Sequence, residues 1–121
     1  MLEETVGKLL MEKQLTIACA ESCTGGLLTS CLTDVEGSSA YVMGSVVSYT
    51  NEVKESLVGV KHETLVTHGA VSEETAREMA EGIRHVIGTA LGVGITGIAG
   101  PGGGTETKPV GLVYIAVAGD K

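Results

Sequence analysis

The hydrophobic positions of this chain follow two patterns, helical spacing and short continuous apolar runs. Apolar residues three or four positions apart predict amphipathic helices over residues 2–13 and over the segment that follows Ser72. Ser72 is suited to cap that second helix, whose first turn holds Glu73 and Glu74. The apolar positions are Leu2, Val6, Leu9 and Leu10 in the first helix, and Ala76, Met79, Ala80, Ile83 and Ile87 in the second.

Four short uncharged runs, rich in Val, Ile, Leu and Ala, predict strands. An apolar helix is predicted over residues 27–32, and a short helix over residues 51–57 with Asn51 as its N-cap. Helices that alternate with short apolar strands indicate a layered α/β fold. The four predicted strands cover residues 15–20, 41–50, 91–96 and 110–118.

Polar and glycine-rich loops follow three of these strands. In layered α/β folds, ligands bind beyond the carboxyl ends of the strands. The candidate loops are residues 21–26, 49–54 and 97–104. We therefore expect the chemistry of the protein to be concentrated where these three loops meet.

Composition narrows the classes of function. The 121 residues fit one domain, and acids outnumber bases fifteen to eight, for a net charge of −7. This balance argues against a nucleic-acid partner, and the three tyrosines are too few for stacking on single strands. Cys19, Cys23 and Cys31 are an odd number without histidines nearby, so neither a disulfide framework nor a metal site is expected.

The chain also lacks the signs of export or membrane insertion. Its first fifteen residues are repeatedly charged and hold no apolar core segment of a signal peptide. The longest uncharged run, residues 86–105, contains eight glycines and Pro101, which a lipid-spanning helix would not tolerate. We expect a cytoplasmic protein with no membrane partner.

Ser22 lies between a predicted buried strand and a predicted helix, with Gly25 and Gly26 behind it. This is a favourable place for a nucleophile, because backbone amides at the helix start can stabilise an oxyanion. Ser22 or Thr24 can equally serve as the cap of that helix. Local sequence leaves both interpretations open.

A serine nucleophile needs a base, and several residues compete for that role. Lys54 follows a strand end, and a desolvated lysine can lose its proton near neutral pH, although a solvated surface lysine is the alternative. A histidine-based triad requires one of His62, His68 and His85, none of which has an obvious carboxylate partner.

Cys23 is an alternative nucleophile. It is either an activated thiol at a helix start or a small packing residue.

The loop over residues 97–104 holds five glycines in eight residues. Glycine lets the backbone approach a ligand and direct successive amides at an anion, so this loop is either an anion-binding segment or a plain connection. The stretch over residues 92–97 matches G-x-G-x-x-G, but its glycines lie within a predicted strand and no helix follows. It is therefore not a dinucleotide fingerprint.

Four ordered motifs together resemble the CinA C-terminal domain family, whose characterised activity is deamidation of nicotinamide mononucleotide. The likeness extends from the first helix to the strand around residues 111–117. It implies an α/β/α sandwich with a mixed, mostly parallel sheet. The motifs are AESCTGG at residues 20–26, SYTNEVK at 48–54, HGAVS at 68–72 and GITGIAGPGG at 94–103.

The resemblance implies roles at matching positions. Ser22 would be the nucleophile and Lys54 the general base of a Ser-Lys dyad, with Tyr49 and Thr96 supporting proton transfer and substrate placement. It implies a small-molecule nucleotide substrate and neither a cofactor nor a metal. The substrate-binding positions would be Cys23, Thr24, Gly25, Gly26, Asn51, Gly97, Gly100, Pro101, Gly102 and Gly103.

The resemblance also bears on assembly. Family members continue past the last strand with a further loop and helix, which carry an arginine thought to help bind substrate, whereas this sequence stops at Lys121. A missing helix would leave one sheet face partly uncovered. We therefore expect a homo-oligomer, a dimer or larger.

Overall fold

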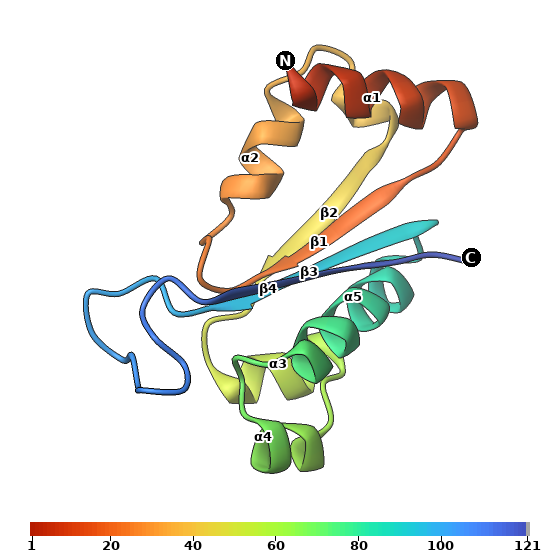
Figure 1. Ribbon diagram of the computed structural model, residues 1–121. Helices are drawn as coiled ribbons and strands as arrows, with labels where there is room; N and C mark the ends of the chain where they lie inside the picture. The colour runs from red at the N-terminus through yellow and green to blue at the C-terminus, as the bar shows by residue number, and fades with distance from the viewer. Residues whose placement is uncertain (121) are drawn as a thin grey trace.

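A four-stranded sheet lies between two layers of helices in the computed structural model, which describes residues 1–120 (Figure 1). Within these residues, no helix combines the length and the apolar character needed to cross a membrane. The elements are α1 (Leu2–Lys13), β1 (Ile17–Glu21), α2 (Leu27–Thr33), the 3-10 helix η1 (Ser38–Ala40), β2 (Val42–Val47), α3 (Asn51–Val58), α4 (His62–His68), α5 (Glu73–Ile87), β3 (Leu91–Gly97) and β4 (Val113–Ala118).

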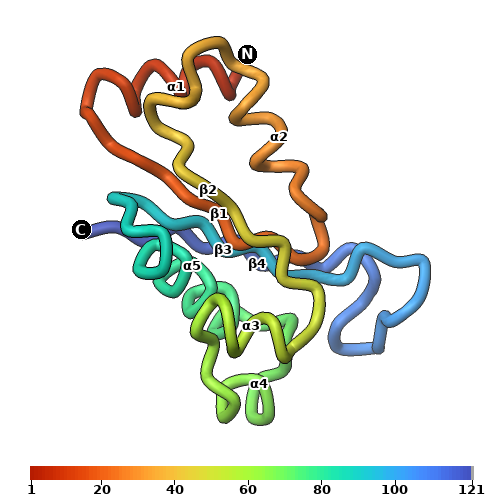
Figure 2. The backbone as a smooth tube through the Cα atoms, turned by 180° about the vertical axis from the view of Figure 1, so that it is seen from behind, coloured from red at the N-terminus to blue at the C-terminus, as the bar shows by residue number. Residues whose placement is uncertain are grey.

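The sheet has the strand order β2-β1-β3-β4. Strand β1 runs parallel to both β2 and β3, and β4 pairs with β3 in the antiparallel direction. Helices α1 and α2 lie on one face, and α3, α4 and α5 lie on the other, as the two opposite views show (Figures 1 and 2). The expected α/β/α sandwich with a mixed, mostly parallel sheet is confirmed, and β1, β2 and β3 end at the same edge.

Strand β1 is buried on both faces, because a hydrophobic core lies on each side of the sheet. Successive strand residues point to opposite faces. Cys19 accordingly belongs to the core under α1 and α2, whereas Ala18 and Ala20 belong to the core against α5. The next two residues continue this alternation, which decides the directions of Glu21 and Ser22.

Two glycines of β3 allow helix α5 to pack closely on the sheet. A Cβ atom at Gly94 would clash with the backbone of Ala76 and Ala80, and one at Gly92 would clash with Ala80 and Arg84. Any side chain at these positions would push the helix away from the strand. The G-x-G pattern of this segment therefore serves helix-to-sheet packing, in agreement with its rejection as a dinucleotide fingerprint.

The structure corrects three details of the predicted elements. The cap of α3 is Thr50, whose hydroxyl accepts a hydrogen bond from the Val53 amide, and Asn51 is the first helical residue. Strand β4 begins at Val113, because residues 109–112 form a turn closed by a Leu112-to-Pro109 hydrogen bond of 3.1 Å. Helix α4 was not predicted, since its seven residues are too few to show a periodic apolar stripe.

Candidate active site

The three polar loops meet at the carboxyl edge of the sheet and enclose a cavity of about 380 Å³. Parallel strands β1, β2 and β3 deliver these loops to the same edge, so the cavity lies where the sequence predicts a ligand site. The cavity is lined by Ser22, Cys23, Tyr49, Asn51, Lys54, Ala70, Val71, Thr96, Gly97, Ile98, Ala99, Gly100, Gly102 and Gly103.

Ser22 is the first residue after β1, and its backbone is still held by the sheet. Its amide donates a hydrogen bond to the Ile95 carbonyl at 3.1 Å. Glu21, one position earlier, directs its side chain to α2 on one face, where it meets Leu28 and Thr29. The Ser22 side chain lies on the opposite side, within hydrogen-bond distance of Lys54 from α3.

Lys54 is a buried lysine, with only 2% of its surface exposed. Its Nζ lies 3.3 Å from Ser22 Oγ, 3.1 Å from the Ser48 carbonyl oxygen and 3.3 Å from the Tyr49 carbonyl oxygen. Burial lowers the pKa of the Lys54 amine, and the neighbouring Cys23 thiol offsets part of this effect. No carboxylate is among its hydrogen-bond partners in the part of the chain that the structure describes.

This set of neighbours suits a neutral amine. A neutral Nζ carries two N–H groups and one lone pair. When the two N–H groups of a neutral amine donate to the Ser48 and Tyr49 carbonyls, the lone pair is left on the side of the Ser22 hydroxyl; the ammonium form instead donates to all three oxygens. In either form, Lys54 Nζ and Ser22 Oγ are within hydrogen-bond distance, at 3.3 Å.

Thr96 and Tyr49 have different relations to the cavity. Thr96 is buried, and its hydroxyl donates to the Ala70 carbonyl at 2.7 Å, tying β3 to the segment between α4 and α5. The Tyr49 side chain is 82% exposed, and only its backbone carbonyl contacts Lys54. Tyr49 thus contributes its backbone carbonyl to the Lys54 contacts, and no hydrogen bond joins its hydroxyl to Lys54 within residues 1–120.

The amino end of α2 is occupied by the carboxylate of Glu21. Its oxygens accept hydrogen bonds from the Leu28 amide at 3.0 Å, the Thr29 amide at 2.8 Å and the Thr24 hydroxyl at 2.6 Å. The N-cap position is Gly26, without a side-chain cap. The alternative in which Ser22 or Thr24 caps this helix is therefore wrong, and Ser22 is free to face the cavity.

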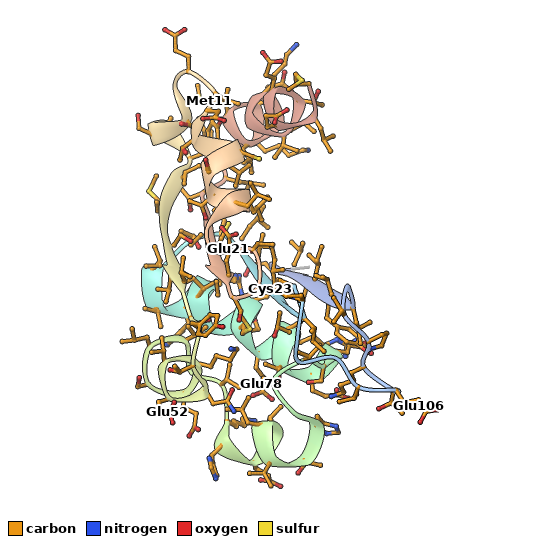
Figure 3. The ribbon with its side chains drawn as sticks, turned by 90° about the vertical axis from the view of Figure 1, so that its left-hand side faces the viewer. Met11, Glu21, Cys23, Glu52, Glu78 and Glu106 are labelled. Carbon is orange, nitrogen blue, oxygen red and sulfur yellow. The ribbon has the colours of Figure 1, made fainter. Side chains whose placement is uncertain are left out.

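Cys23, which follows Ser22 in the chain, also lines the cavity. Figure 3 shows it close to Glu21, at the end of β1. Burial raises the pKa of the Cys23 thiol, the charge of Glu21 adds to the rise, and the backbone amides of Cys23 and Thr24 and the charge of Lys54 oppose it. A thiol with a raised pKa is a weak nucleophile at neutral pH.

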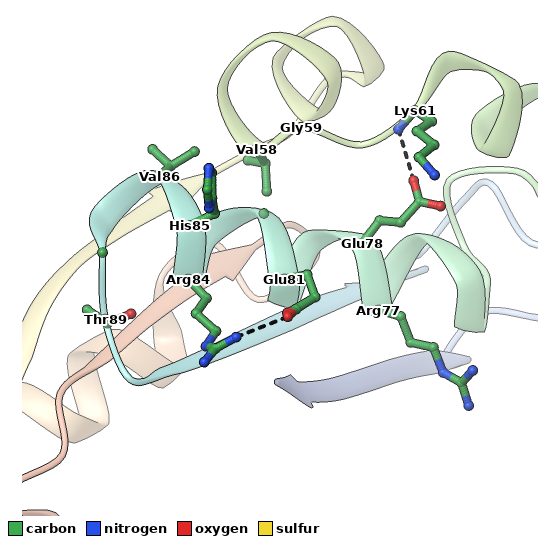
Figure 4. A pocket seen from close by; sticks show the side chains of 12 residues that line it. Val58, Gly59, Lys61, Arg77, Glu78, Glu81, Arg84, His85, Val86 and Thr89 are labelled. Carbon is green, nitrogen blue, oxygen red and sulfur yellow. Dashed lines mark hydrogen bonds and ion pairs between the residues drawn. The ribbon is translucent and has the colours of Figure 1, made fainter. Parts of the chain in front are cut away.

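None of the three histidines lines this cavity. His62 pairs with Glu55 at 3.1 Å, and His68 lies 3.7 Å from Glu74. His85 lines a separate open groove of about 850 Å³ between α3 and α5, where Glu78 accepts a hydrogen bond from the Lys61 amide (Figure 4). Within residues 1–120, no group of three or more His, Cys, Asp or Glu side chains is arranged to hold a metal ion.

Most predicted site residues line the cavity, and a few do not. Thr24 bonds to Glu21, the Gly25 amide donates to the Ser22 carbonyl at 3.1 Å, and Gly26 and Pro101 are absent from the lining. Sequence reasoning missed Ala70 and Val71, which join the lining from the α4–α5 connection. The HGAVS motif that contains them could have indicated this segment, but its only reactive side chains are those of His68 and Ser72.

These features define a three-layer α/β protein with a polar cavity at the carboxyl edge of its sheet. The chain belongs to the CinA C-terminal domain family, whose model matches residues 1–121. It is 56% identical to a CinA-like protein of Desulforapulum autotrophicum and 57% identical to one of Chloroherpeton thalassium, over 98% and 97% of this chain. The chain spans 28% of the length of each of these two relatives.

Solved structures agree with the fold. The competence/damage inducible protein CihA from Agrobacterium tumefaciens superposes with a TM-score of 0.96 at 45% identity, over 98% of this chain and 72% of that chain. A competence-damaged protein (CinA) superfamily protein from Escherichia coli superposes with a TM-score of 0.93 at 34% identity, over 98% of this chain and 69% of that chain.

Proposed function

We propose that this chain is an amidohydrolase that deamidates nicotinamide mononucleotide to nicotinate mononucleotide and ammonia. The observation that carries the proposal is the 3.3 Å separation between Lys54 Nζ and Ser22 Oγ inside a cavity. A neutral lysine at this distance can activate a serine hydroxyl toward a carboxamide carbon. The characterised activity of the family that the chain resembles supports the choice of substrate.

The first half of the reaction uses Ser22 and Lys54. Ser22 Oγ forms a bond to the carboxamide carbon while its proton moves to Lys54 Nζ. The carbon–nitrogen bond of the tetrahedral intermediate then breaks, and the departing nitrogen takes the proton from Lys54 and leaves as ammonia. General base assistance of this kind contributes about 100- to 10,000-fold to the rate.

The second half returns the enzyme to its starting state. A water molecule attacks the ester carbonyl of the nicotinoyl-enzyme, and Lys54 takes a proton from it. The carbon–oxygen bond to Ser22 then breaks, and the proton returns to Ser22 Oγ as nicotinate mononucleotide departs.

The oxyanion of each intermediate needs donors beside Ser22. The amides of α2 that were expected to serve are engaged, since Leu28 and Thr29 donate to Glu21 and Gly25 donates to Ser22. We assign the role to the Cys23 and Thr24 amides, which follow Ser22 directly and donate no backbone hydrogen bond within residues 1–120. One such donor is worth about 3 kcal/mol in the transition state.

The glycine-rich loop is suited to the anionic part of the substrate. Gly100, Gly102 and Gly103 line the cavity together with Lys54. Backbone amides can bind a phosphate locally even though the whole chain carries a charge of −7. This supports a mononucleotide rather than free nicotinamide as the substrate.

The test is ammonia release from nicotinamide mononucleotide, measured beside nicotinamide and NAD. Ser22→Ala is expected to abolish ammonia release while its circular dichroism and unfolding midpoint stay unchanged. Ser30→Ala, in α2 and outside the cavity lining, is the matched control and should retain activity. Turnover by Ser22→Ala would overturn the proposal, and binding without ammonia release by the wild type would favour a non-catalytic nucleotide-binding module.

We also propose that the chain forms a homo-oligomer. Val113, Ile115 and Val117 of β4 are 41%, 66% and 68% exposed. They pair in register with Gly97, Ile95 and Val93, and they therefore lie on the α1–α2 face of the sheet. A second copy would remove this apolar stripe from water. Light scattering on the purified chain tests this proposal, and a monomer at all concentrations would contradict it.

A further inference from the structure

Glu21 is a fully buried carboxylate that the proposed chemistry does not use. Its exposed fraction is 0%, and it lies one position before Ser22 at the end of β1 (Figure 3). Burial by itself would raise the pKa of this carboxyl, but hydrogen bonds from Thr24, Thr29 and Leu28 outweigh burial and lower the pKa. The surrounding hydrogen-bond donors therefore stabilise Glu21 as a buried anion.

Both carboxylate oxygens are engaged. Oε1 accepts from the Thr24 hydroxyl at 2.6 Å and the Leu28 amide at 3.0 Å. Oε2 accepts from the Thr29 amide at 2.8 Å and also from the Thr29 hydroxyl. Since a hydroxyl has one proton to donate, Thr29 Oγ1 must in turn accept from Ser45 Oγ, 2.8 Å away on β2.

The backbone of Glu21 is fixed as firmly as its side chain. The Ser48 amide donates to the Glu21 carbonyl at 2.7 Å, and the following amide, that of Ser22, donates to the Ile95 carbonyl at 3.1 Å. The Ser48 carbonyl is itself one of the acceptors that hold Lys54 Nζ. Glu21 thus connects the start of α2 to the ends of β1 and β2, the strands that precede Ser22 and Lys54 in the chain.

We propose that Glu21 is a positioning residue, which clamps the loop of residues 22–26 between β1 and α2 and so holds Ser22 Oγ within reach of Lys54 Nζ. The residue acts through the backbone, because its carboxylate lies on the α2 face and Ser22 faces Lys54 on the other. This inference rests on the proposed function. It also gives a reason why a side chain of the protein, the Glu21 carboxylate, accepts the hydrogen bonds of the amides at the amino end of α2.

The critical variant is Glu21→Gln. Glutamine keeps the size of the side chain but replaces one acceptor oxygen by an NH₂ group, which would face an N–H or O–H donor of Leu28, Thr24 or Thr29. We expect kcat to fall about 10- to 100-fold with KM within about twofold of wild type, since misplacing a reacting group by about 1 Å costs up to roughly 100-fold. Glu21→Asp, which keeps both oxygens, should recover part of the loss.

The chain offers a matched control in Glu78. Its carboxylate accepts from the Lys61 amide at 2.9 Å (Figure 4) and from the Thr64 hydroxyl at 2.7 Å, at the start of α4. Glu78 is outside the lining of the cavity that holds Ser22. Glu78→Gln should lower the unfolding midpoint and leave kcat unchanged. This comparison separates positioning of the nucleophile from stability alone.

A second readout does not depend on the substrate. The rate at which a fluorophosphonate labels Ser22, followed by intact mass, reports the reactivity of the serine whether or not nicotinamide mononucleotide is turned over. Labelling of Glu21→Gln should be slower than that of wild type by at least tenfold, and amide hydrogen exchange of residues 22–29 should be faster.

The outcomes of the two proposals are distinguishable. Equal kcat, labelling and exchange in wild type and Glu21→Gln would overturn the positioning role while leaving the proposed function intact. Labelling of wild-type Ser22 without ammonia release would reject the proposed substrate. The positioning role of Glu21 would then be tested by comparing the labelling rates of wild type and Glu21→Gln. If wild-type Ser22 is not labelled, the serine mechanism fails, and unchanged exchange in Glu21→Gln would then overturn the positioning role as well.

Discussion

The Nζ atom of Lys54 lies 3.3 Å from the Oγ atom of Ser22, although 32 positions separate the two residues in the chain. Ser22 follows β1 and Lys54 lies in the first turn of α3, just after β2. Because β1 and β2 are neighbouring parallel strands, their carboxyl ends bring the two side chains to one place. Burial at that place favours the neutral amine.

The first prediction concerns the proton acceptor. Lys54→Arg should lower kcat for ammonia release by roughly 100- to 10,000-fold, because a guanidinium stays protonated and cannot act as a base. Lys61→Arg, at an exposed lysine outside the cavity lining, should retain wild-type kinetics. Activity within about twofold of wild type in Lys54→Arg would remove Lys54 from the mechanism.

The second prediction concerns pH. Burial lowers the pKa of Lys54 from its ordinary value of 10.5. The proposed mechanism uses the neutral form, so kcat/KM should rise with pH through the lowered pKa, with a midpoint below pH 10.5, and be lost as pH falls through that pKa. If this rise reflects the titration of Lys54, it should be absent from the residual activity of Lys54→Met. The same rise of kcat/KM with pH in Lys54→Met would mean that another group titrates.

The third prediction concerns the thiol beside the nucleophile. Burial raises the pKa of Cys23, and it raises the pKa of buried Cys19 to about 11, so neither thiol is a ready nucleophile. Cys23→Ala should keep kcat for the proposed reaction within roughly threefold of wild type, and iodoacetamide should suppress ammonia release only slowly at neutral pH. Loss of ammonia release in Cys23→Ala, with Ser22→Ala still active, would make Cys23 the nucleophile.

The fourth prediction concerns the glycine-rich segment between β3 and β4. Lys108 Nζ donates to the carbonyl of His68, the last residue of α4, at 2.8 Å, and this contact holds the segment near Ala70 and Val71 of the cavity. Lys108→Met should raise KM roughly fivefold, the equivalent of about 1 kcal/mol for one hydrogen bond, with little change in kcat.

Lys13→Met provides the comparison for Lys108, because Lys13 also lies at the carboxyl end of a helix but remote from the cavity lining. It should leave KM unchanged. Equal KM values in wild type and Lys108→Met would mean that the contact with His68 does not affect substrate binding.

The fifth prediction concerns the packing of α5 on β3. Gly94→Ala should lower the free energy of unfolding by about 1–3 kcal/mol, because its Cβ would press on the backbone of Ala76 and Ala80. Gly44→Ala is the matched strand glycine: its Cβ would meet Ile87 at an ordinary 3.5 Å, and it should be neutral or slightly stabilising. Urea unfolding measures both, and equal midpoints would contradict the packing explanation.

The sequence by itself determined the layered α/β architecture and the edge of the sheet at which the polar loops gather. Helix periodicity, apolar runs and glycine-rich turns are local signals, and they located α1, α5 and the four strands to within a few residues. The same signals selected Ser22, Lys54 and the glycine-rich loop, because each follows a predicted strand.

Only the tertiary structure decided how these groups act on one another. The hydrogen bonds of Lys54 to Ser22 and of Thr96 to Ala70 span 32 and 26 positions, and they depend on strand order and register, which no local pattern records. The same holds for Glu21, which the sequence offered only as a polar residue next to Ser22. Its role as the anion that fills the start of α2 follows from the pleat of β1, which directs it to one face of the sheet and Ser22 to the other.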